Sequence, residues 1–184
     1  MLPDKTQVIL GPPGTGKTST LLQLIENELD SGVSPDKIGF FTFTKRAVNE
    51  GMERAIHKFE LSKKDLPYFK TLHSLSFHQL GLNKEDVFER THLIELNDKL
   101  NIKLTGSQST EDGSIYSMTK DDRLMFIDNL ARMRKIPLED LWHEVEDAVN
   151  WYALDRFSRG YEAYKKSRRL YDYTDMLDFF LQRG

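Results

Sequence analysis

Residues 11–18, Gly-Pro-Pro-Gly-Thr-Gly-Lys-Thr, directly follow the apolar run Val8-Ile9-Leu10 and set the class of fold. The stretch matches the phosphate-binding pattern G-x-x-x-x-G-K-[ST] at every constrained position. A strand-like run precedes it, and a helix-like segment at residues 20–25 follows it. Glycines in this context let successive backbone N–H groups and a helix N-terminus point at one anion. The stretch therefore predicts a nucleoside triphosphate site.

In such a site Lys17 reaches the β- and γ-phosphates and the Thr18 hydroxyl binds Mg²⁺, so ATP and Mg²⁺ are the expected cofactors. Lys17 and Thr18 are also the candidate catalytic residues. The residues expected to bind the nucleotide are Gly11, Pro12, Pro13, Gly14, Thr15, Gly16, Lys17, Thr18 and Ser19. The alternative is a glycine- and proline-rich turn that matches the pattern by chance.

Composition describes an ordinary globular chain of 184 residues, 39% hydrophobic and 30% charged. The net charge of −3 provides no general attraction to nucleic acid, so any such surface must be local. The lack of cysteine excludes disulfides and thiolate metal sites. Neither a leader pattern nor an apolar run long enough to span a bilayer is present, so we expect a cytoplasmic protein without a membrane partner.

Strand-like and helix-like segments alternate from Gln7 to about Leu80, which is typical of a parallel α/β sheet. Strands are predicted at residues 8–10, 38–44 and 69–72. Helices are predicted at residues 17–29 and 45–59, and in a segment that contains Leu75, Phe77 and Leu80. With the phosphate loop after the first strand, this order predicts an α/β fold of the P-loop NTPase (RecA-like) type.

The character of the sequence changes after Gly81. Residues 83–169 are rich in charge and helix formers and contain no convincing strand. Within them we expect a loop at residues 104–118, a helix that begins with the capping pair Thr119 and Asp122, and a long helix at residues 151–169. We predict a core in residues 1–81, a helical insertion in residues 82–169, and a helix in residues 170–184 that returns to the core.

The last predicted helix is amphipathic and covers residues 171–181. Helical periodicity predicts that it buries Tyr173, Leu177, Phe180 and Leu181. Asp172 and Asp175 lie at its start, where carboxylates complement the helix macrodipole.

Three further motifs follow the phosphate loop along the chain. They are Thr42-Phe43-Thr44-Lys45-Arg46-Ala47 with Glu50, Met52 and Arg54 behind it, then Thr71-Leu72-His73-Ser74-Leu75, and finally Tyr171-Asp172-Tyr173-Thr174-Asp175-Met176-Leu177. They resemble motif Ia, motif Ib and the segment before the Walker B strand of UvrD/Rep/PcrA-type superfamily 1 helicases. The resemblance covers most of the chain and implies an ATP-dependent DNA helicase, of which this chain holds the 1A core with a 1B insertion.

The resemblance also implies where single-stranded DNA binds: Phe43 would contact a base, while Thr44, Thr71 and His73 would contact the backbone. The carboxyl ends of parallel strands share one edge of a sheet, where ligands bind. The same residues are expected at this edge, together with Lys45, and they could hold the phosphates and bases of a single strand. Simpler interpretations remain open. Phe43 fits an apolar core, His73 fits a helix start, and Lys45 fits a solvated surface.

Hydrolysis needs a Walker B carboxylate pair at the end of a strand. The only apolar run that ends in Asp is residues 124–128, and its flanks have helical spacing. In the resembled family the acidic strand follows the helix at residues 171–181. We therefore expect a fragment truncated before Walker B, inactive alone, whose partners are the remaining helicase domains and single-stranded DNA.

Two other functions are compatible with a phosphate loop. A hexameric unfoldase of the AAA+ type shares the phosphate loop, but it would need an acidic pair in the window after Phe59, and none is present. A nucleotide-binding regulatory or interaction module that never hydrolyses ATP stays open as the alternative.

Overall fold

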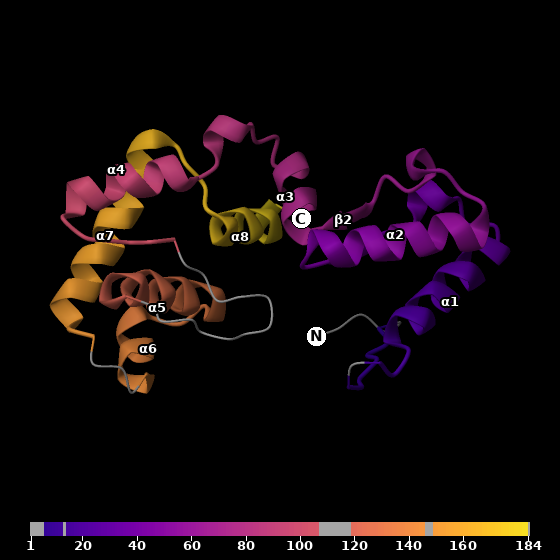
Figure 1. The fold of residues 1–184 in the computed structure, drawn as a ribbon, viewed down its shortest axis with the longest axis horizontal. Coiled ribbons are helices and arrows are strands. Elements are labelled where there is room, and N and C mark those ends of the chain that lie inside the picture. The colour runs from indigo at the N-terminus through magenta and orange to yellow at the C-terminus, as the bar shows by residue number, and fades with distance from the viewer. Residues whose placement is uncertain (1–5, 13, 107–118, 146–148, 184) are drawn as a thin grey trace. The chain divides into compact units, whose positions relative to one another are not determined.

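The computed structural model describes residues 6–12, 14–106, 119–145 and 149–183. It divides into two compact units, residues 1–75 and residues 76–184 (Figure 1). Among the described residues, no helix has both the length and the apolar composition that crossing a membrane requires.

The first unit is built around a parallel two-stranded sheet. Its elements are α1 (Lys17–Asp30), the 3-10 turn η1 (Pro35–Lys37), β1 (Phe40–Thr42), α2 (Lys45–Phe59), the 3-10 turn η2 (Lys63–Asp65) and β2 (Phe69–Thr71). β1 pairs with β2 in parallel, with Phe40 opposite Phe69 and Thr42 opposite Thr71. Parallel neighbours require a crossover, which α2 provides. The predicted strands at residues 38–44 and 69–72 are thus confirmed in shortened form.

The core of the first unit lies between the sheet and its helices. The Phe40 and Phe69 rings stack with centroids 5.1 Å apart. Helices α1 and α2 add apolar side chains to this pair, as does the loop before β2. The buried members of the cluster are Leu22, Ile25, Phe40, Ala55, Leu66 and Phe69.

The predicted strand at residues 8–10 is wrong for this structure. These residues form no regular element, and the side chains of Val8 and Leu10 are 67% and 88% exposed. A strand is held by ladder hydrogen bonds from a neighbour, and the described part of the chain forms a sheet of β1 and β2 alone. The described chain is therefore mainly helical with a small parallel sheet.

The second unit is helical, as predicted. Helix α3 (Leu72–Gln79) runs across the boundary between the units. The remaining elements are η3 (Lys84–Asp86), α4 (Arg90–Leu100), α5 (Lys120–Arg134), α6 (Leu138–Glu144), α7 (Trp151–Arg168) and α8 (Tyr173–Arg183). Thr119 caps α5 through a reciprocal pair with Asp122, which confirms the predicted capping. Residues 124–128 lie inside α5, so the structure excludes them as a Walker B strand.

A single apolar cluster holds α4, α5, α6 and α7 together. Leu96, Leu141 and Leu154 have no exposed surface, and Ile127 and Phe157 have almost none. Leu104, from the predicted loop at residues 104–118, joins this cluster, and both its N–H and its carbonyl are bonded by the Asn97 side chain. Residues 107–118 of that loop lie outside the described residues.

The predicted inward face of α8 is partly wrong. Tyr173 and Leu181 are 56% and 70% exposed, and the buried apolar side chain is Met176. The aspartates at the start of α8 bind cations of α5 and α7, as described below, and this orients the helix. Four residues after Asp172, Met176 then lies on the inward face.

Gly51 decides how closely α2 packs on β1. A Cβ at this position would lie 2.4 Å from Cε1 and 2.8 Å from Cζ of Phe40. Because the Phe40 ring is stacked on Phe69, it has little room to move away. A glycine in the middle of α2 is therefore explained by the close approach of the helix to the strand.

We expect Gly51→Ala to lower the free energy of unfolding by about 1–3 kcal/mol, because overpacking outweighs the better helix propensity of alanine. The matched control is Asn49→Ala on the exposed side of the same helix, which should change stability by less than about 0.5 kcal/mol. Urea unfolding followed by circular dichroism compares them. Equal midpoints for the two variants would contradict this account of the packing.

Candidate functional site

The phosphate loop forms a compact turn that leads directly into α1. Gly14 and Gly16 have φ values of 81° and 80°, a left-handed conformation that favours glycine. The Thr15 hydroxyl donates to the Pro12 carbonyl at 2.8 Å, and Gly16 is the N-cap residue of α1. Pro13 lies outside the described residues. The two glycines therefore lie at the positions of the turn that require a positive φ.

Lys17 lies over this loop. Its ammonium donates to the carbonyl oxygens of Gly11 at 2.6 Å and Pro12 at 2.7 Å. Helix α1 begins at Lys17 with no side-chain cap and no acidic residue in its first turn. The helix N-terminus and the Lys17 ammonium thus form a positive region, to which an anion is attracted.

Thr18 and Ser19 complete the predicted set within the first turn of α1. Thr18 is partly buried and Ser19 is exposed. Both come directly after the lysine, in the turn of α1 that follows the loop. The local geometry thus brings the described members of the predicted nucleotide site together.

The predicted DNA-contacting residues gather at the carboxyl edge of the two-stranded sheet. Thr42 pairs with Thr71 in parallel register, so the chain leaves β1 and β2 at the same edge. Thr44 follows β1 and caps α2, its hydroxyl accepting from the Ala47 N–H at 3.1 Å. The Thr71 hydroxyl accepts from the Ser74 N–H at 3.1 Å at the start of α3. Both hydroxyls thus help to begin a helix.

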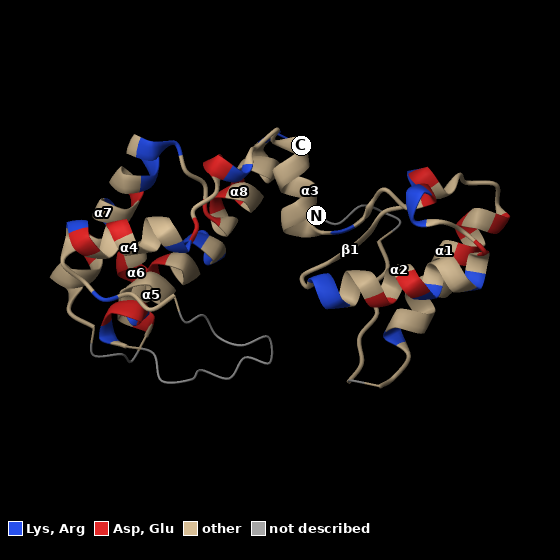
Figure 2. Ribbon diagram, turned by 45° about the horizontal axis from the view of Figure 1, so that its top comes forward, with Lys and Arg blue, Asp and Glu red and all other residues tan. Residues whose placement is uncertain are grey.

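Phe43 is the exposed aromatic residue of this edge. Its side chain is 78% exposed, so the alternative of a core residue is wrong. Lys45 and Arg46 are exposed at the start of α2, which is the blue end of that helix near β1 in Figure 2. Burial lowers the pKa of half-buried His73, so its imidazole is neutral at pH 7. The edge combines an aromatic ring, two cations and hydroxyls.

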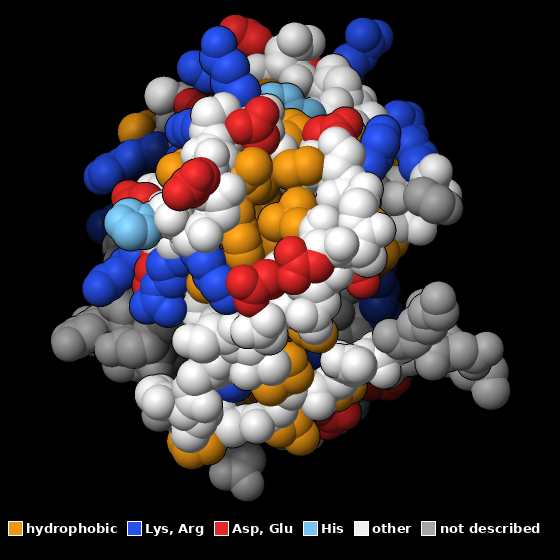
Figure 3. All heavy atoms as spheres, turned by 90° about the vertical axis from the view of Figure 1, so that its right-hand side faces the viewer, with side chains coloured by type: hydrophobic (Ala, Val, Ile, Leu, Met, Phe, Trp, Pro, Cys, Tyr) orange, Lys and Arg blue, Asp and Glu red, His pale blue; other side chains and the backbone are white. Residues whose placement is uncertain are grey.

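The first unit also contains an apolar hollow of about 220 Å³. It is lined by Leu21, Leu24, Ile25, Glu28, Ile38, Gly39 and Phe40. Figure 3 likewise shows a face on which hydrophobic side chains form a group bordered by acidic and basic ones. Because the lining offers one charged side chain, the hollow does not suit a polyphosphate, and the phosphate loop contributes no lining residue.

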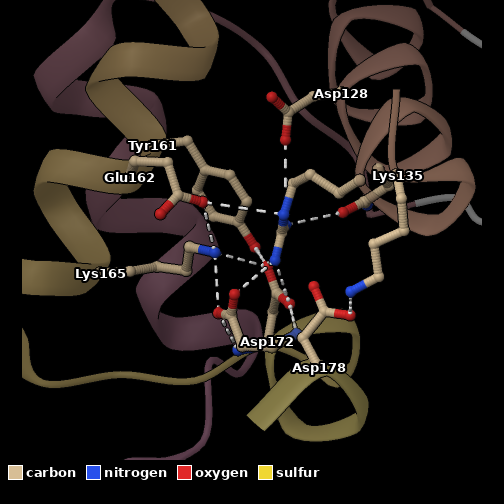
Figure 4. A network of polar contacts seen from close by, with 10 residues as sticks. Asp128, Lys135, Tyr161, Glu162, Lys165, Asp172 and Asp178 are labelled. Atoms are coloured by element: carbon tan, nitrogen blue, oxygen red, sulfur yellow. Dashed lines mark hydrogen bonds and ion pairs between the residues drawn. The ribbon is translucent and has the colours of Figure 1, made fainter. Parts of the chain in front are cut away.

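Asp172 and Asp175 do more than complement a helix dipole. Each accepts a hydrogen bond from the other's backbone N–H, at 2.8 and 3.0 Å, at the start of α8. Arg132 of α5 donates to both oxygens of Asp172, at 2.7 and 3.0 Å, and to Asp175 at 2.5 Å. Lys165 of α7 donates to each aspartate at 2.8 Å. Two cations from two helices therefore hold one turn of α8 (Figure 4).

Three side chains surround this centre. The Tyr161 hydroxyl donates to Asp172 at 2.8 Å, and Glu162 pairs with Lys165 at 2.7 Å. Lys135 binds Asp178 on the next turn of α8. The Lys165 ammonium also lies 4.5 Å from the centroid of the Tyr161 ring. Helices α5, α7 and α8 are thus joined by polar contacts as well as by the apolar core.

Burial and ion pairing shift the pKa values of these groups in opposite directions. Burial favours a neutral Asp172, but hydrogen bonds from Arg132 and the nearby charges of Lys165 and Arg132 hold its pKa well below the usual range. Burial and the charge of Asp172 raise the pKa of Asp175. Burial lowers the pKa of Lys165, but the charge of Asp172 and the hydrogen bonds to Asp172 and Asp175 together outweigh burial, so the net shift of the pKa is upward. Asp172 is therefore the ionised centre of the network.

Sequence reasoning missed Arg132, Tyr161 and Lys165 as partners of these aspartates. A signal was present in the long helix, where Tyr161 and Lys165 are four residues apart on the same side as the buried Leu154 and Phe157. A lysine on the apolar face of a helix needs a carboxylate partner. Which carboxylate it meets depends on the packing of α7 against α8.

We expect Asp172→Asn to lower the free energy of unfolding by about 3–5 kcal/mol at pH 7, because it leaves buried cations without a partner. Asp155→Asn, which removes a partner of exposed Arg159, is the matched control and should cost about 0–1 kcal/mol.

The pH dependence has a definite sign. A carboxyl group whose pKa is lower in the folded state stabilises the fold above its unfolded pKa of about 3.9. The difference between wild type and Asp172→Asn should therefore be full above about pH 5 and shrink as the pH falls below about 4. Unfolding curves at several pH values test this, and a difference that grows towards acid pH would contradict it.

Comparison with known proteins identifies the family of this chain. No curated protein matches the chain. The family model described as the UvrD/REP helicase N-terminal domain matches residues 1–182. That span includes the phosphate loop, the carboxyl edge of the sheet and the network that holds α8. The chain belongs to the UvrD/REP helicase N-terminal domain family.

Proposed function

We propose that this chain is the ATP-binding N-terminal part of an ATP-dependent DNA helicase that moves along single-stranded DNA. Its family is one of DNA helicases. The observation that carries the nucleotide part of the proposal is the phosphate loop itself. Gly14 and Gly16 adopt a left-handed conformation, and α1 begins directly after them without a side-chain cap. The Lys17 ammonium lies within 2.7 Å of the carbonyl oxygens of the loop.

Binding of Mg-ATP follows from these contacts. The γ-phosphate offers the Lys17 ammonium a charged acceptor in place of the Gly11 and Pro12 carbonyls, and charge-assisted hydrogen bonds are roughly twice as strong as neutral ones. The Thr18 hydroxyl would bind Mg²⁺. In this proposal residues 11–19 bind the nucleotide, within a RecA-like core formed by residues 1–81.

Hydrolysis requires groups beyond this loop. β1 and β2 end in Thr42 and Thr71, Asp128 lies inside α5, and the sequence contains no Asp-Glu pair. Water positioning and charge neutralisation would then come from the remaining helicase domains, which we propose as partners. In the same proposal residues 82–169 form the helical insertion and residues 170–184 return towards the core.

Single-stranded DNA would lie along the carboxyl edge of the sheet. Exposed Phe43 offers a ring on which a base can stack, and exposed Lys45 offers a charge to a phosphate. Neutral His73 and the Thr44 and Thr71 hydroxyls offer hydrogen bonds to the backbone. The proposal rests on the parallel register that brings the two strand ends together.

We expect Lys17→Ala to weaken Mg-ATP binding by about tenfold or more, since hydrogen bonds to charged groups contribute about 1.5–3 kcal/mol. Calorimetric titration of the whole chain measures this. Lys37→Ala is the control, since Lys37 is an exposed lysine in η1 with a surface partner, Asp36. Equal ATP affinity for wild type and Lys17→Ala would contradict the nucleotide assignment.

Phe43→Ala and Lys45→Ala should weaken binding of a short oligonucleotide in different ways. Losing one stacked base costs about 1–3 kcal/mol, so Phe43→Ala should lower affinity without changing the salt dependence. Lys45→Ala should instead reduce the slope of log K against log salt by about 0.7, because one fewer counterion is released.

Fluorescence anisotropy across a salt series measures both effects. The control is Lys99→Ala on α4, an exposed lysine of the second unit, which should bind DNA as the wild type does. If Lys99→Ala weakened binding while Phe43→Ala and Lys45→Ala did not, the DNA would lie elsewhere on the chain.

A further inference from the structure

A second hollow, of about 250 Å³, lies within the helical unit beside the charged network. Its lining is Asp128, Ala131, Arg132, Ile136, Leu138, Ser158, Glu162 and Asp175. The apolar members come from the end of α5 and the turn into α6, and the acidic members come from α5, α7 and α8. The hollow thus has an aliphatic side and a carboxylate side.

Asp128 is the unusual member of this lining. Its side chain is 2% exposed, and its Oδ2 is buried without a hydrogen-bond partner among the described residues. Ser158 bonds the same carboxyl group, but the closest Arg132 nitrogen is 3.9 Å from Oδ2, too far for a hydrogen bond. In Figure 4 a dashed line marks this long ion pair between Asp128 and the guanidinium. A buried carboxylate oxygen without a donor is costly, which indicates an acceptor for a further N–H or O–H group.

The charges around the hollow do not balance. The carboxylates of Asp128, Glu162, Asp172 and Asp175 meet two cations, Arg132 and Lys165. Both cations are already hydrogen-bonded to Asp172 and Asp175. Carboxyl groups therefore outnumber cations beside a buried acceptor, which favours a cation as the partner of that acceptor.

The geometry argues for an organic cation rather than a metal ion. Across the described ranges, no three acidic or histidine side chains are grouped so that they could hold a metal. The aliphatic side of the hollow, Ala131, Ile136 and Leu138, also suits a hydrocarbon stem, along which Lys and Arg side chains commonly pack.

We propose that this hollow binds a guanidinium or primary ammonium group on a short aliphatic stem. Its N–H groups would donate to Asp128 Oδ2 and Glu162, and its stem would lie on Ile136 and Leu138. The chemistry is that of an arginine or lysine side chain presented by a protein segment, or of a free small amine. The residues of this site belong to the second unit, whereas the residues proposed for the nucleotide and DNA belong to the first.

The electrostatics of Asp128 support this site. Burial raises the pKa of Asp128, and the charge of Glu162 adds to the increase, although Ser158, Arg132 and Lys165 oppose it. Asp175 on α8 is the further carboxylate of the lining. A bound cation favours the ionised form, so its affinity should rise with pH as Asp128 loses its proton.

The test titrates the whole chain with n-butylguanidinium, and with n-butylurea as the neutral molecule of similar shape. Amide NMR shifts of α5, α6 and α7 report binding. We expect saturable shifts around Asp128 and Ile136 with n-butylguanidinium at millimolar concentrations, tighter binding at higher pH, and no such shifts with n-butylurea.

Two variants locate the contact. Asp128→Asn should weaken n-butylguanidinium binding about tenfold or more, because it removes a charged acceptor. Asp98→Asn makes the same change at an exposed position on α4 and should bind like wild type. A pentapeptide with a central arginine, compared with its citrulline counterpart, shows whether the hollow also accepts a protein segment or only a free amine.

Three results would overturn the proposal. They are equal binding of the cation and n-butylurea to the wild-type chain, the absence of saturable shifts around Asp128, and unchanged affinity in a folded Asp128→Asn. The first two need no variant, so the test holds even if Asp128→Asn fails to fold.

Discussion

The arrangement of the helical unit depends on the hydrogen bonds that the buried Asp172 carboxylate accepts. It accepts hydrogen bonds from Arg132, Lys165 and Tyr161, and so joins α5, α7 and α8 at one buried point. Buried charges are costly unless they are fully paired, so the three helices can pack only in a way that brings these groups together. The same requirement turns Met176 of α8 inward and leaves Tyr173 and Leu181 exposed. It also leaves Asp128, at the margin of the network, with an acceptor that the described chain does not fill.

The first unit depends on a different constraint, the parallel register of β1 and β2. This register stacks Phe40 on Phe69 and sets the strand ends at Thr42 and Thr71 side by side. Gly51 lets α2 pack closely on this sheet, because a larger residue would hold α2 away from Phe40. Phe43, Lys45 and His73 follow these strand ends in the sequence. The pairing of β1 with β2 therefore also brings these polar and aromatic side chains to one edge of the sheet. The unit thus couples apolar packing to the surface proposed for DNA.

Much of this organisation could be predicted from local sequence. The phosphate loop, the helix at residues 45–59, the capping of α5 by Thr119 and the change to helical structure after Gly81 all depend on neighbouring residues and periodicity. The strand predicted at residues 8–10 shows the limit of such reasoning. Its apolar composition suits a strand, but a strand also needs a partner in space, and local composition does not supply one.

The sequence by itself determined the family and predicted the class of ligand, because a glycine-rich loop with lysine and threonine at fixed spacing is a local pattern that needs only a helix after it. Only the tertiary structure decided which cations meet Asp172 and Asp175, that Phe43 is exposed, and that Asp128 is buried with an unfilled acceptor. Arg132 and Asp172 are 40 residues apart. Their contact depends on how helices pack, and the free energy of a charge depends on what surrounds it in space rather than along the chain.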